Sequence, residues 1–206
     1  DGALPLREAR WIRISGCPVL ASRISYVGEL GWELSTDASA AVGVWDALRA
    51  AGLAHGLEPI GYRAVDSLRM EKAYRYFGTD MTMLETPDEA GLGAFVRVDK
   101  GDFIGRDALL ARRAEVGTGA RRLRTIVIGD AAGYLPVYGG EAVRSAGVVV
   151  GRLRSSAYST TLSRTIAYVY LASDTEEGAP LVVDVFDQRV PAVVVADVVF
   201  DPRGER

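Results

Sequence analysis

Two stretches of the chain decide its fold. Residues 23–34 read Arg-Ile-Ser-Tyr-Val-Gly-Glu-Leu-Gly-Trp-Glu-Leu, and residues 61–75 read Gly-Tyr-Arg-Ala-Val-Asp-Ser-Leu-Arg-Met-Glu-Lys-Ala-Tyr-Arg. The first stretch is strand-like, and its glycines are read as a turn, because glycine adopts positive φ without steric cost. The second stretch places apolar residues along one face of a helix. The N-terminal part of the chain is therefore expected to combine short strands with helices.

The flanking sequence extends this pattern. Residues 11–34 are broken by Gly16, Pro18 and Gly28, which predicts several short strands. A first helix is predicted from apolar positions at helical spacing, with Gly52 placed to end it: Ala41, Val44, Trp45 and Leu48. A second helix is predicted from near Pro59 to Phe77, ending at Gly78. On that helix Asp66 can pair with Arg69, and Glu71 with Arg75, along the surface.

The character of the chain changes after residue 122. A short strand near residues 94–98 and a helix near 107–114 precede a segment, 115–122, that combines two glycines with charge and no periodicity. We place a domain boundary there, with one domain over residues 1–116 and the other over 117–206. The second domain contains five apolar, β-branched runs without an intervening helix: 125–128, 148–153, 165–171, 181–186 and 190–200. Such runs predict a small antiparallel β-barrel, and the fold class as a whole is α+β.

Composition narrows the functional classes. The 206 residues carry a net charge of −3, which argues against a nucleic-acid partner. Cys17 and His55 are the single cysteine and the single histidine, so the sequence offers no internal disulfide, no zinc cluster and no Cys/His catalytic pair. The sequence shows neither an apolar run long enough to span a bilayer nor a signal pattern, and a cytoplasmic location is expected by default.

The two decisive stretches, taken together, resemble the folate-binding module of the glycine-cleavage T-protein (aminomethyltransferase) family, in the variant found in dimethylglycine and sarcosine dehydrogenases. The resemblance runs from about residue 11 to residue 202. It implies the C-terminal half of a folate-binding α/β subdomain followed by the family's β-barrel. It also implies tetrahydrofolate as the cofactor, with Glu33 accepting hydrogen bonds from the pterin and Tyr74 contacting the folate. Glu29 is read as a turn residue.

Two positions depart from the family patterns. Val65 stands where the glycine-cleavage enzymes carry a cofactor-binding arginine in Ala-Arg-Asp-Ser-Leu-Arg, so that role has no carrier here. The difference favours the dimethylglycine or sarcosine branch, and Arg69 is read as a structural ion-pair partner. Ala73 replaces the glycine of the dehydrogenase motif Glu-Lys-Gly-Tyr-Arg, which places a methyl group near the ligand.

The family's catalytic aspartate precedes the region that resembles residues 28–31, and no match to it lies upstream of Glu29. We therefore assign no catalytic residue and expect the chain to be the C-terminal portion of a larger polypeptide. FAD would belong to an N-terminal half outside this chain. The expected function is tetrahydrofolate-dependent capture of a methylene group released from dimethylglycine or sarcosine. Two alternatives stay open: a glycine-cleavage aminomethyltransferase or folate-dependent demethylase without a flavin half, and a non-catalytic folate-binding or assembly module.

Overall fold

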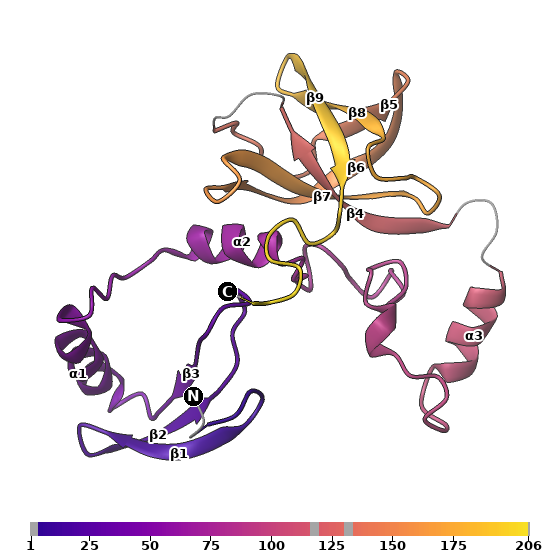
Figure 1. Cartoon of the computed structure of the whole chain (residues 1–206). Helices are drawn as coiled ribbons and strands as arrows, with labels where there is room; N and C mark the ends of the chain where they lie inside the picture. Colours follow the sequence, from indigo (N-terminus) through magenta and orange to yellow (C-terminus); the bar gives the residue numbers. More distant parts are fainter. Residues whose placement is uncertain (1–3, 116–119, 130–133, 206) are drawn as a thin grey trace. The chain divides into compact units, whose positions relative to one another are not determined.

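The computed structural model describes residues 4–115, 120–129 and 134–205 (Figure 1). The chain forms two compact units. Unit 1 comprises Asp1–Val65 with Gly204–Arg206, and unit 2 comprises Asp66–Arg203. The boundary predicted between residues 116 and 117 falls outside the described residues and stays a prediction.

Unit 1 contains a three-stranded antiparallel sheet and one helix. Its strands β1 (Ala9–Ile14), β2 (Cys17–Ser22) and β3 (Glu33–Ser35) lie in the order β1-β2-β3, and α1 spans Ala41–Leu53. The β1–β2 hairpin turns through Ser15 and Gly16, both with positive φ, as a two-residue hairpin connection requires. The strands and the first helix agree with the sequence-based expectation.

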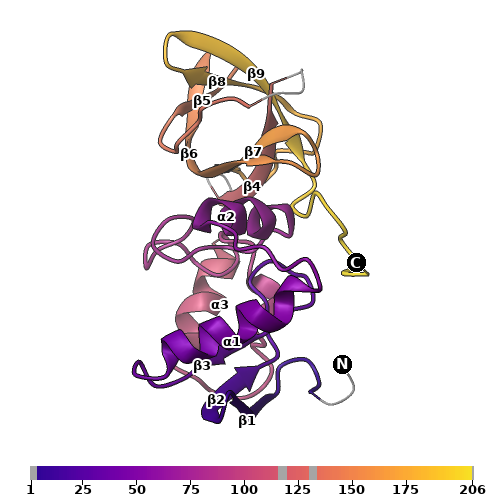
Figure 2. The ribbon, with the colours of Figure 1, turned by 90° about the vertical axis from the view of Figure 1, so that its left-hand side faces the viewer.

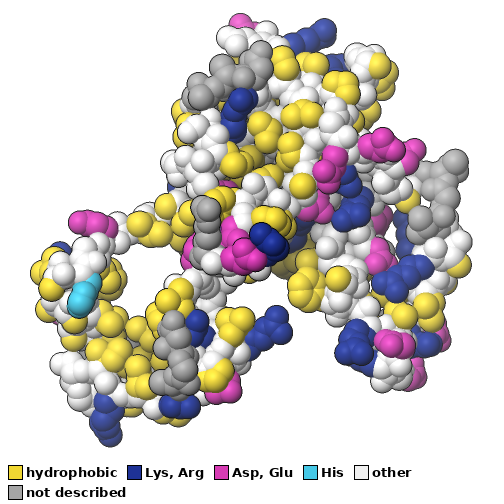
Figure 3. Space-filling view, in the orientation of Figure 1, with side chains coloured by type: hydrophobic (Ala, Val, Ile, Leu, Met, Phe, Trp, Pro, Cys, Tyr) yellow, Lys and Arg dark blue, Asp and Glu magenta, His cyan; other side chains and the backbone are white. Residues whose placement is uncertain are grey.

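The two faces of this sheet differ in burial. Val19 and Ala21 of β2 are buried on one face, whereas Leu20 between them points to the opposite face, because side chains alternate along a strand. Trp11 lies opposite Leu20 and is 67% exposed. Many other large apolar side chains of unit 1 are also exposed, and Figure 3 shows hydrophobic side chains gathered on its visible surface.

The helices differ from expectation at their ends. Helix α2 spans Tyr62–Glu71, so it is shorter at both ends than the predicted helix from Pro59 to Phe77. The strand predicted near residues 94–98 is wrong, because this segment contains the 3-10 turn η1 (Gly93–Phe95) instead. Helix α3 (Arg106–Ala114) agrees with the predicted helix.

The rest of unit 2 is a closed antiparallel barrel, seen along its opening in Figure 2. Its strands pair in the cyclic order β4-β7-β6-β5-β8-β9. Their bounds are β4 Arg121–Ile128, β5 Ala142–Ser145, β6 Val148–Ser159, β7 Arg164–Ala172, β8 Pro180–Val185 and β9 Gln188–Val195. The predicted barrel is confirmed, but the sequence runs missed the four-residue strand β5, and β9 ends at Val195 rather than near residue 200.

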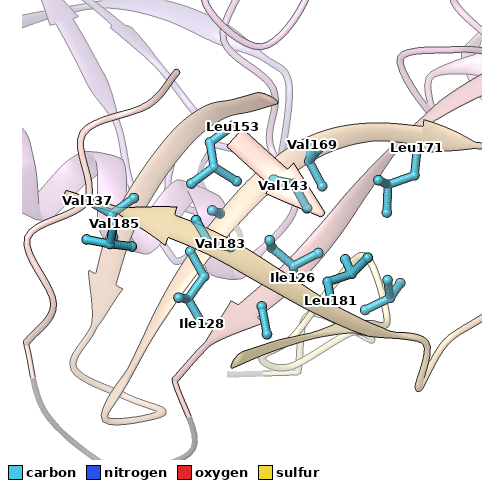
Figure 4. Close-up of a cluster of buried hydrophobic side chains, with 13 residues drawn as sticks. Ile126, Ile128, Val137, Val143, Leu153, Val169, Leu171, Leu181, Val183 and Val185 are labelled. Carbon is cyan, nitrogen blue, oxygen red and sulfur yellow. The ribbon is translucent and has the colours of Figure 1, made fainter. Parts of the chain in front are cut away.

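Apolar side chains from all six strands fill the barrel (Figure 4). Ile126, Val143, Val169 and Val183, on four different strands, are each fully buried. Gly151 of β6 allows the strands to approach closely, because a Cβ there would lie 2.7 Å from the carbonyl oxygen of Tyr170. A second buried cluster joins Met70 of α2 to Leu123, Ile166, Tyr168 and Tyr170 of the barrel. This cluster anchors the end of α2 on the barrel wall.

In the part of the chain that the structure describes, no helix is both long enough and apolar enough to cross a bilayer.

Candidate functional site

Glu33 is the first residue of β3, and its side chain lies on the open face of the sheet. It pairs with Ser22, while Ser35, two residues on, pairs with Leu20, which in turn lies opposite Trp11. Directly opposed residues, and residues two apart on a strand, share a face. The Glu33 side chain is exposed.

A hollow of about 530 Å³ opens on this same face. Glu33 does not line it, but Ser35, two residues further along β3, does. Its lining comes from the three strands and the segment after β3: Trp11, Pro18, Leu20, Ser35, Thr36 and Asp37. The segment after β3 is fixed by a hydrogen bond from the Thr36 hydroxyl to the carbonyl oxygen of Pro18, at 2.8 Å. The floor is largely apolar. Such a surface can hold a flat ring, while a neighbouring carboxylate accepts hydrogen bonds from the ring's N–H groups.

Tyr74 lies beyond the C-terminus of α2, not within the helix as predicted. Ala73 takes a φ of +58°, a left-handed conformation that ends the helix. The amide N–H of Ala73 donates to the carbonyl oxygen of Met70 at 3.0 Å, and that of Tyr74 donates to the carbonyl oxygen of Arg69 at 2.9 Å. These two bonds form a Schellman turn, in which glycine is the usual left-handed residue. Ala73 therefore occupies a position of backbone strain, and Tyr74 is presented directly after it, 40% exposed.

Arg69 connects this turn to the barrel through hydrogen bonds and an ion pair. Its side chain is 2% exposed, and Asp80, which is fully buried, accepts a hydrogen bond from Nη1 at 2.5 Å. Nη1 also donates to the carbonyl oxygen of Tyr74 at 2.9 Å, and Nη2 donates to the Ser155 hydroxyl at 2.8 Å. Nε pairs with Asp66 at 3.1 Å. The predicted pair of Arg69 with Asp66 is confirmed, but Arg69 itself is buried and also pairs with Asp80 in the interior rather than lying on the surface.

Asp80 organises the segment that follows Tyr74. One carboxylate oxygen accepts the amide N–H of Tyr76 at 2.8 Å in addition to Arg69, and the other accepts the amide N–H of Ser155 at 3.2 Å. Burial by itself would lower the pKa of Arg69. The charge and hydrogen bond of Asp80 outweigh this effect, so the pKa of Arg69 lies above its ordinary value. Residues 74–76 are therefore fixed by a buried ionic network.

Tyr168 of β7 completes the support under α2. Burial raises the pKa of its phenol to about 12, although Arg75 and Arg69 nearby act in the opposite direction. The hydroxyl therefore stays protonated, and it donates to the carbonyl oxygen of Met70 at 3.0 Å. The guanidinium of Arg75 lies 4.4 Å from the centroid of the Tyr168 ring.

Glu71 does not make the predicted surface pair with Arg75. Its side chain is buried, and its two carboxylate oxygens accept hydrogen bonds from the hydroxyls of Ser159, at 2.5 Å, and Thr161, at 3.0 Å. Arg75 instead lies 3.9 Å from Asp197, measured from Nη2 to Oδ2. Both side chains thus bind the barrel and the segment that follows it.

Sequence reasoning missed Asp80 and Ser155 as partners of Arg69. Asp80 lies in a segment without periodicity, and Ser155 lies 86 residues from Arg69 along the chain. A single sequence gives no signal for these contacts, because nothing in it distinguishes charged residues that pair in the interior from charged residues on the surface.

Glu33 belongs to unit 1 and Tyr74 to unit 2. Each is placed within its own unit, and their joint contact with one ligand stays a prediction. Within residues 4–115, 120–129 and 134–205, no group of three or more His, Cys, Asp or Glu side chains is arranged to bind a metal ion.

Comparison with protein families agrees with both parts of the fold. The model of the GCVT N-terminal domain matches residues 1–100, and the model of the glycine cleavage T-protein C-terminal barrel domain matches residues 121–201. The chain belongs to the glycine cleavage T-protein family. The closed barrel is thus the C-terminal barrel of this family, and the sheet, α1 and α2 lie within the match to the GCVT N-terminal domain, whereas α3 lies between the two matches.

Relatives within the T-protein family include dehydrogenases and aminomethyltransferases. The chain is 39% identical to sarcosine dehydrogenase of Mus musculus over 184 residues, and this match covers 88% of this chain and 19% of the relative. It is 34% identical to dimethylglycine dehydrogenase of Homo sapiens, over 96% of this chain and 22% of the relative. It is 38% identical to an aminomethyltransferase of Streptomyces coelicolor, over 89% of this chain and 50% of the relative. The chain therefore spans half or less of the length of these relatives.

A solved structure supports the fold independently. The glycine cleavage system aminomethyltransferase T of Bartonella henselae superposes with a TM-score of 0.82 at 20% identity, over 98% of this chain and 54% of that chain. At this identity the likeness establishes the T-protein fold.

Proposed function

We propose that this chain binds tetrahydrofolate and takes part in one-carbon transfer coupled to the oxidative demethylation of dimethylglycine or sarcosine. The observation that carries the proposal is the position of Glu33, in a chain of the T-protein family, on an open sheet face beside an apolar hollow. Tetrahydrofolate, when bound, supplies the nitrogen atoms that accept the one-carbon unit.

The chemistry of Glu33 suits the pterin end of tetrahydrofolate. A carboxylate can accept two parallel hydrogen bonds from an amino group and an adjacent ring N–H, as it does from an arginine. Each such charge-assisted bond contributes on the order of 1.5–3 kcal/mol. The hollow beside Glu33, lined in part by Trp11 and Leu20, offers an apolar floor for the flat ring. Asp37, which lines the hollow, is a second carboxylate that offers the same kind of acceptor, and the variants Glu33→Gln and Asp37→Asn separate the two.

Tyr74 is proposed as a residue that contacts the folate. Its ring is partly exposed while its backbone is clamped at both the N–H and the carbonyl group by Arg69. Ordering the backbone before binding lowers the entropic cost of holding a ligand. The Tyr74 ring can therefore pack against the folate.

The dehydrogenase branch is proposed on two grounds. Val65 stands where the glycine-cleavage enzymes carry a cofactor-binding arginine, and the relatives include sarcosine and dimethylglycine dehydrogenases. On this reading, FAD-dependent oxidation of the amine takes place in another part of the full-length polypeptide, and this chain contributes to capture of the methylene group.

An aminomethyltransferase of the glycine cleavage system is the second candidate. The 38% identity to the enzyme of Streptomyces coelicolor favours it about as strongly as the identities to the dehydrogenases favour the first. The two candidates share tetrahydrofolate at Glu33 and differ in the amine donor.

The test uses the full-length polypeptide that contains this chain. With dimethylglycine or sarcosine and tetrahydrofolate, the wild type is expected to form 5,10-methylenetetrahydrofolate. Glu33→Gln is expected to keep amine oxidation but release free formaldehyde, because only the capture step uses Glu33. Glu29→Gln, in the turn before β3, is the matched control and is expected to leave capture unchanged, and a larger loss of capture in Asp37→Asn than in Glu33→Gln would place the pterin on Asp37 instead. Unaltered capture in Glu33→Gln would refute the assignment, and activity with glycine-cleavage substrates alone would favour the second candidate.

A further inference from the structure

The segment after β9 returns to the end of α2. The amide N–H groups of Val199 and Phe200 both donate to the carbonyl oxygen of Glu71, at 3.1 and 3.2 Å. Asp201, the next residue, accepts a hydrogen bond from Nζ of Lys72 at 2.7 Å. We call residues 199–201 the C-terminal strap.

The strap supplies partners that the helix end needs. The last four carbonyl groups of an α-helix receive no hydrogen bond from an amide N–H within the helix, so their donors must come from outside it. In α2, the carbonyl oxygens of Arg69 and Met70 are reached by the turn residues and by Tyr168, whereas that of Glu71 is reached by the strap. Three separate parts of the chain thus meet at the last turn of this helix.

The ion pair of the strap is well shielded from water. The side chains of Lys72 and Asp201 are 6% and 7% exposed, and Nζ of Lys72 also lies 5.0 Å from the centroid of the Phe200 ring. A shielded pair is screened little by salt and holds its geometry more firmly than an exposed one. A lysine at the C-terminus of a helix is also favoured by the helix dipole.

The turn beside this pair is intrinsically unfavourable. Ala73 has a φ of +58°, which non-glycine residues adopt at a cost, and it lies directly between Lys72 and Tyr74. A strained turn persists only where its surroundings determine it. The strap contacts the two residues immediately before Ala73, so it restrains the turn from the helix side.

We propose that the C-terminal strap holds the turn that presents Tyr74, and that Asp201 is a positioning residue for tetrahydrofolate binding through its pair with Lys72. The ligand-binding part of this inference rests on the proposed function. The restraint on the turn does not, and it can be measured without a ligand.

The first experiment is amide hydrogen exchange on the whole 206-residue chain. Asp201→Asn is suitable because asparagine has the same shape and tolerates the left-handed conformation that Asp201 adopts, with a φ of +46°. Exchange at the amides of Ala73 and Tyr74 is expected to become about tenfold faster, because the turn opens more often. Lys72→Met removes the other partner of the pair without changing the backbone at residue 201, and it should give a similar increase. The control Asp184→Asn removes the partner of Arg144 within the barrel and should leave both amides unchanged.

The second experiment is a double-mutant cycle on tetrahydrofolate affinity. Asp201→Asn is expected to weaken binding several-fold in the wild type and to have no further effect in a Tyr74→Ala background, because it acts through Tyr74. Equal losses in both backgrounds, or unchanged amide exchange in Asp201→Asn, would overturn the proposal. If the wild type does not bind tetrahydrofolate but amide exchange at Ala73 and Tyr74 becomes faster in Asp201→Asn, the restraint by the strap is supported and the proposed function is refuted.

Discussion

Replacing Asp80 with Asn removes the negative charge from the buried network under Tyr74. Asp80 is fully buried, and its oxygens accept hydrogen bonds from the guanidinium of Arg69 and from the amides of Tyr76 and Ser155. The single carbonyl oxygen of Asn can face only one side of this network. If it faces Arg69 and Tyr76, the amide group of Asn meets the N–H of Ser155 as a second donor.

The expected loss of stability follows from burial. Removing one partner of a buried ion pair costs about 3–5 kcal/mol, since the other charge stays behind without compensation. Asp66 keeps its 3.1 Å contact with Arg69, but it is 41% exposed and compensates weakly. We therefore expect Asp80→Asn to lower the free energy of unfolding by about 3 kcal/mol, the lower end of that range.

Urea unfolding followed by circular dichroism measures this loss. With slopes of about 1–3 kcal/mol per molar urea, the midpoint should fall by about 1–3 M. Asp184→Asn is the matched control, because both side chains of the Arg144–Asp184 pair are 26% exposed. For such a pair the expected loss is about 1 kcal/mol or less. Equal midpoint shifts for Asp80→Asn and Asp184→Asn would refute the importance of the buried network.

Three further predictions concern stability. Ala73→Gly should stabilise the chain by about 0.5–1 kcal/mol in urea unfolding, because glycine relieves the left-handed turn at a smaller entropic cost, whereas Ala111→Gly inside α3 should destabilise it by a similar amount. Burial would raise the pKa of Glu85, but hydrogen bonds from Thr82 together with the charge of Arg154 lower it below its ordinary value of 4.5. The ionised Glu85 therefore stabilises the folded chain above pH 4.5, and this stabilisation is lost as the pH falls through the pKa that Glu85 has in the folded state. The urea midpoints of wild type and Glu85→Gln should accordingly converge in acid, and a difference that stays constant with pH would contradict this. Burial raises the pKa of Tyr168 and of Tyr170 from 10.0 to about 12, so the stabilisation from these protonated phenols is lost as the pH rises from 10 through 12, and an alkaline titration of tyrosinate absorbance should show both ionising last.

Local patterns predicted much of the fold. Helix α1 followed from four apolar positions at helical spacing, and most barrel strands followed from β-branched runs between turn residues. Strand β5 was missed because only four residues, one of them fully buried, carry its signal. Residues 94–98 read as a strand because apolar residues recur there, although the segment forms a 3-10 turn.

The end of α2 could not be predicted locally. Tyr74, Tyr76 and Phe77 continue an apolar pattern, so the sequence favours a longer helix. The structure ends it at Glu71 because Ala73 turns left-handed and Asp80 takes the amide of Tyr76. Such contacts depend on tertiary structure, and they override helical propensity.

The candidate site was predicted by resemblance more than by residue pattern. A glutamate at the start of a short strand carries little information by itself. Its place on the open face of the sheet, beside a hollow, emerges only from the register of β2 with β3. The register also separates Glu33 from the turn that contains Glu29.

A tetrahydrofolate titration of the wild type, Glu33→Gln and Glu29→Gln tests the central claim most directly. Gln keeps the shape of Glu33 but exchanges one acceptor for a donor that would face the pterin's own N–H. The loss of a charge-assisted bond, on the order of 1.5–3 kcal/mol, should weaken affinity by about tenfold or more. Glu29→Gln should change affinity far less. Equal affinities for the two mutants, or a larger loss at Glu29, would contradict the placement of the pterin on Glu33.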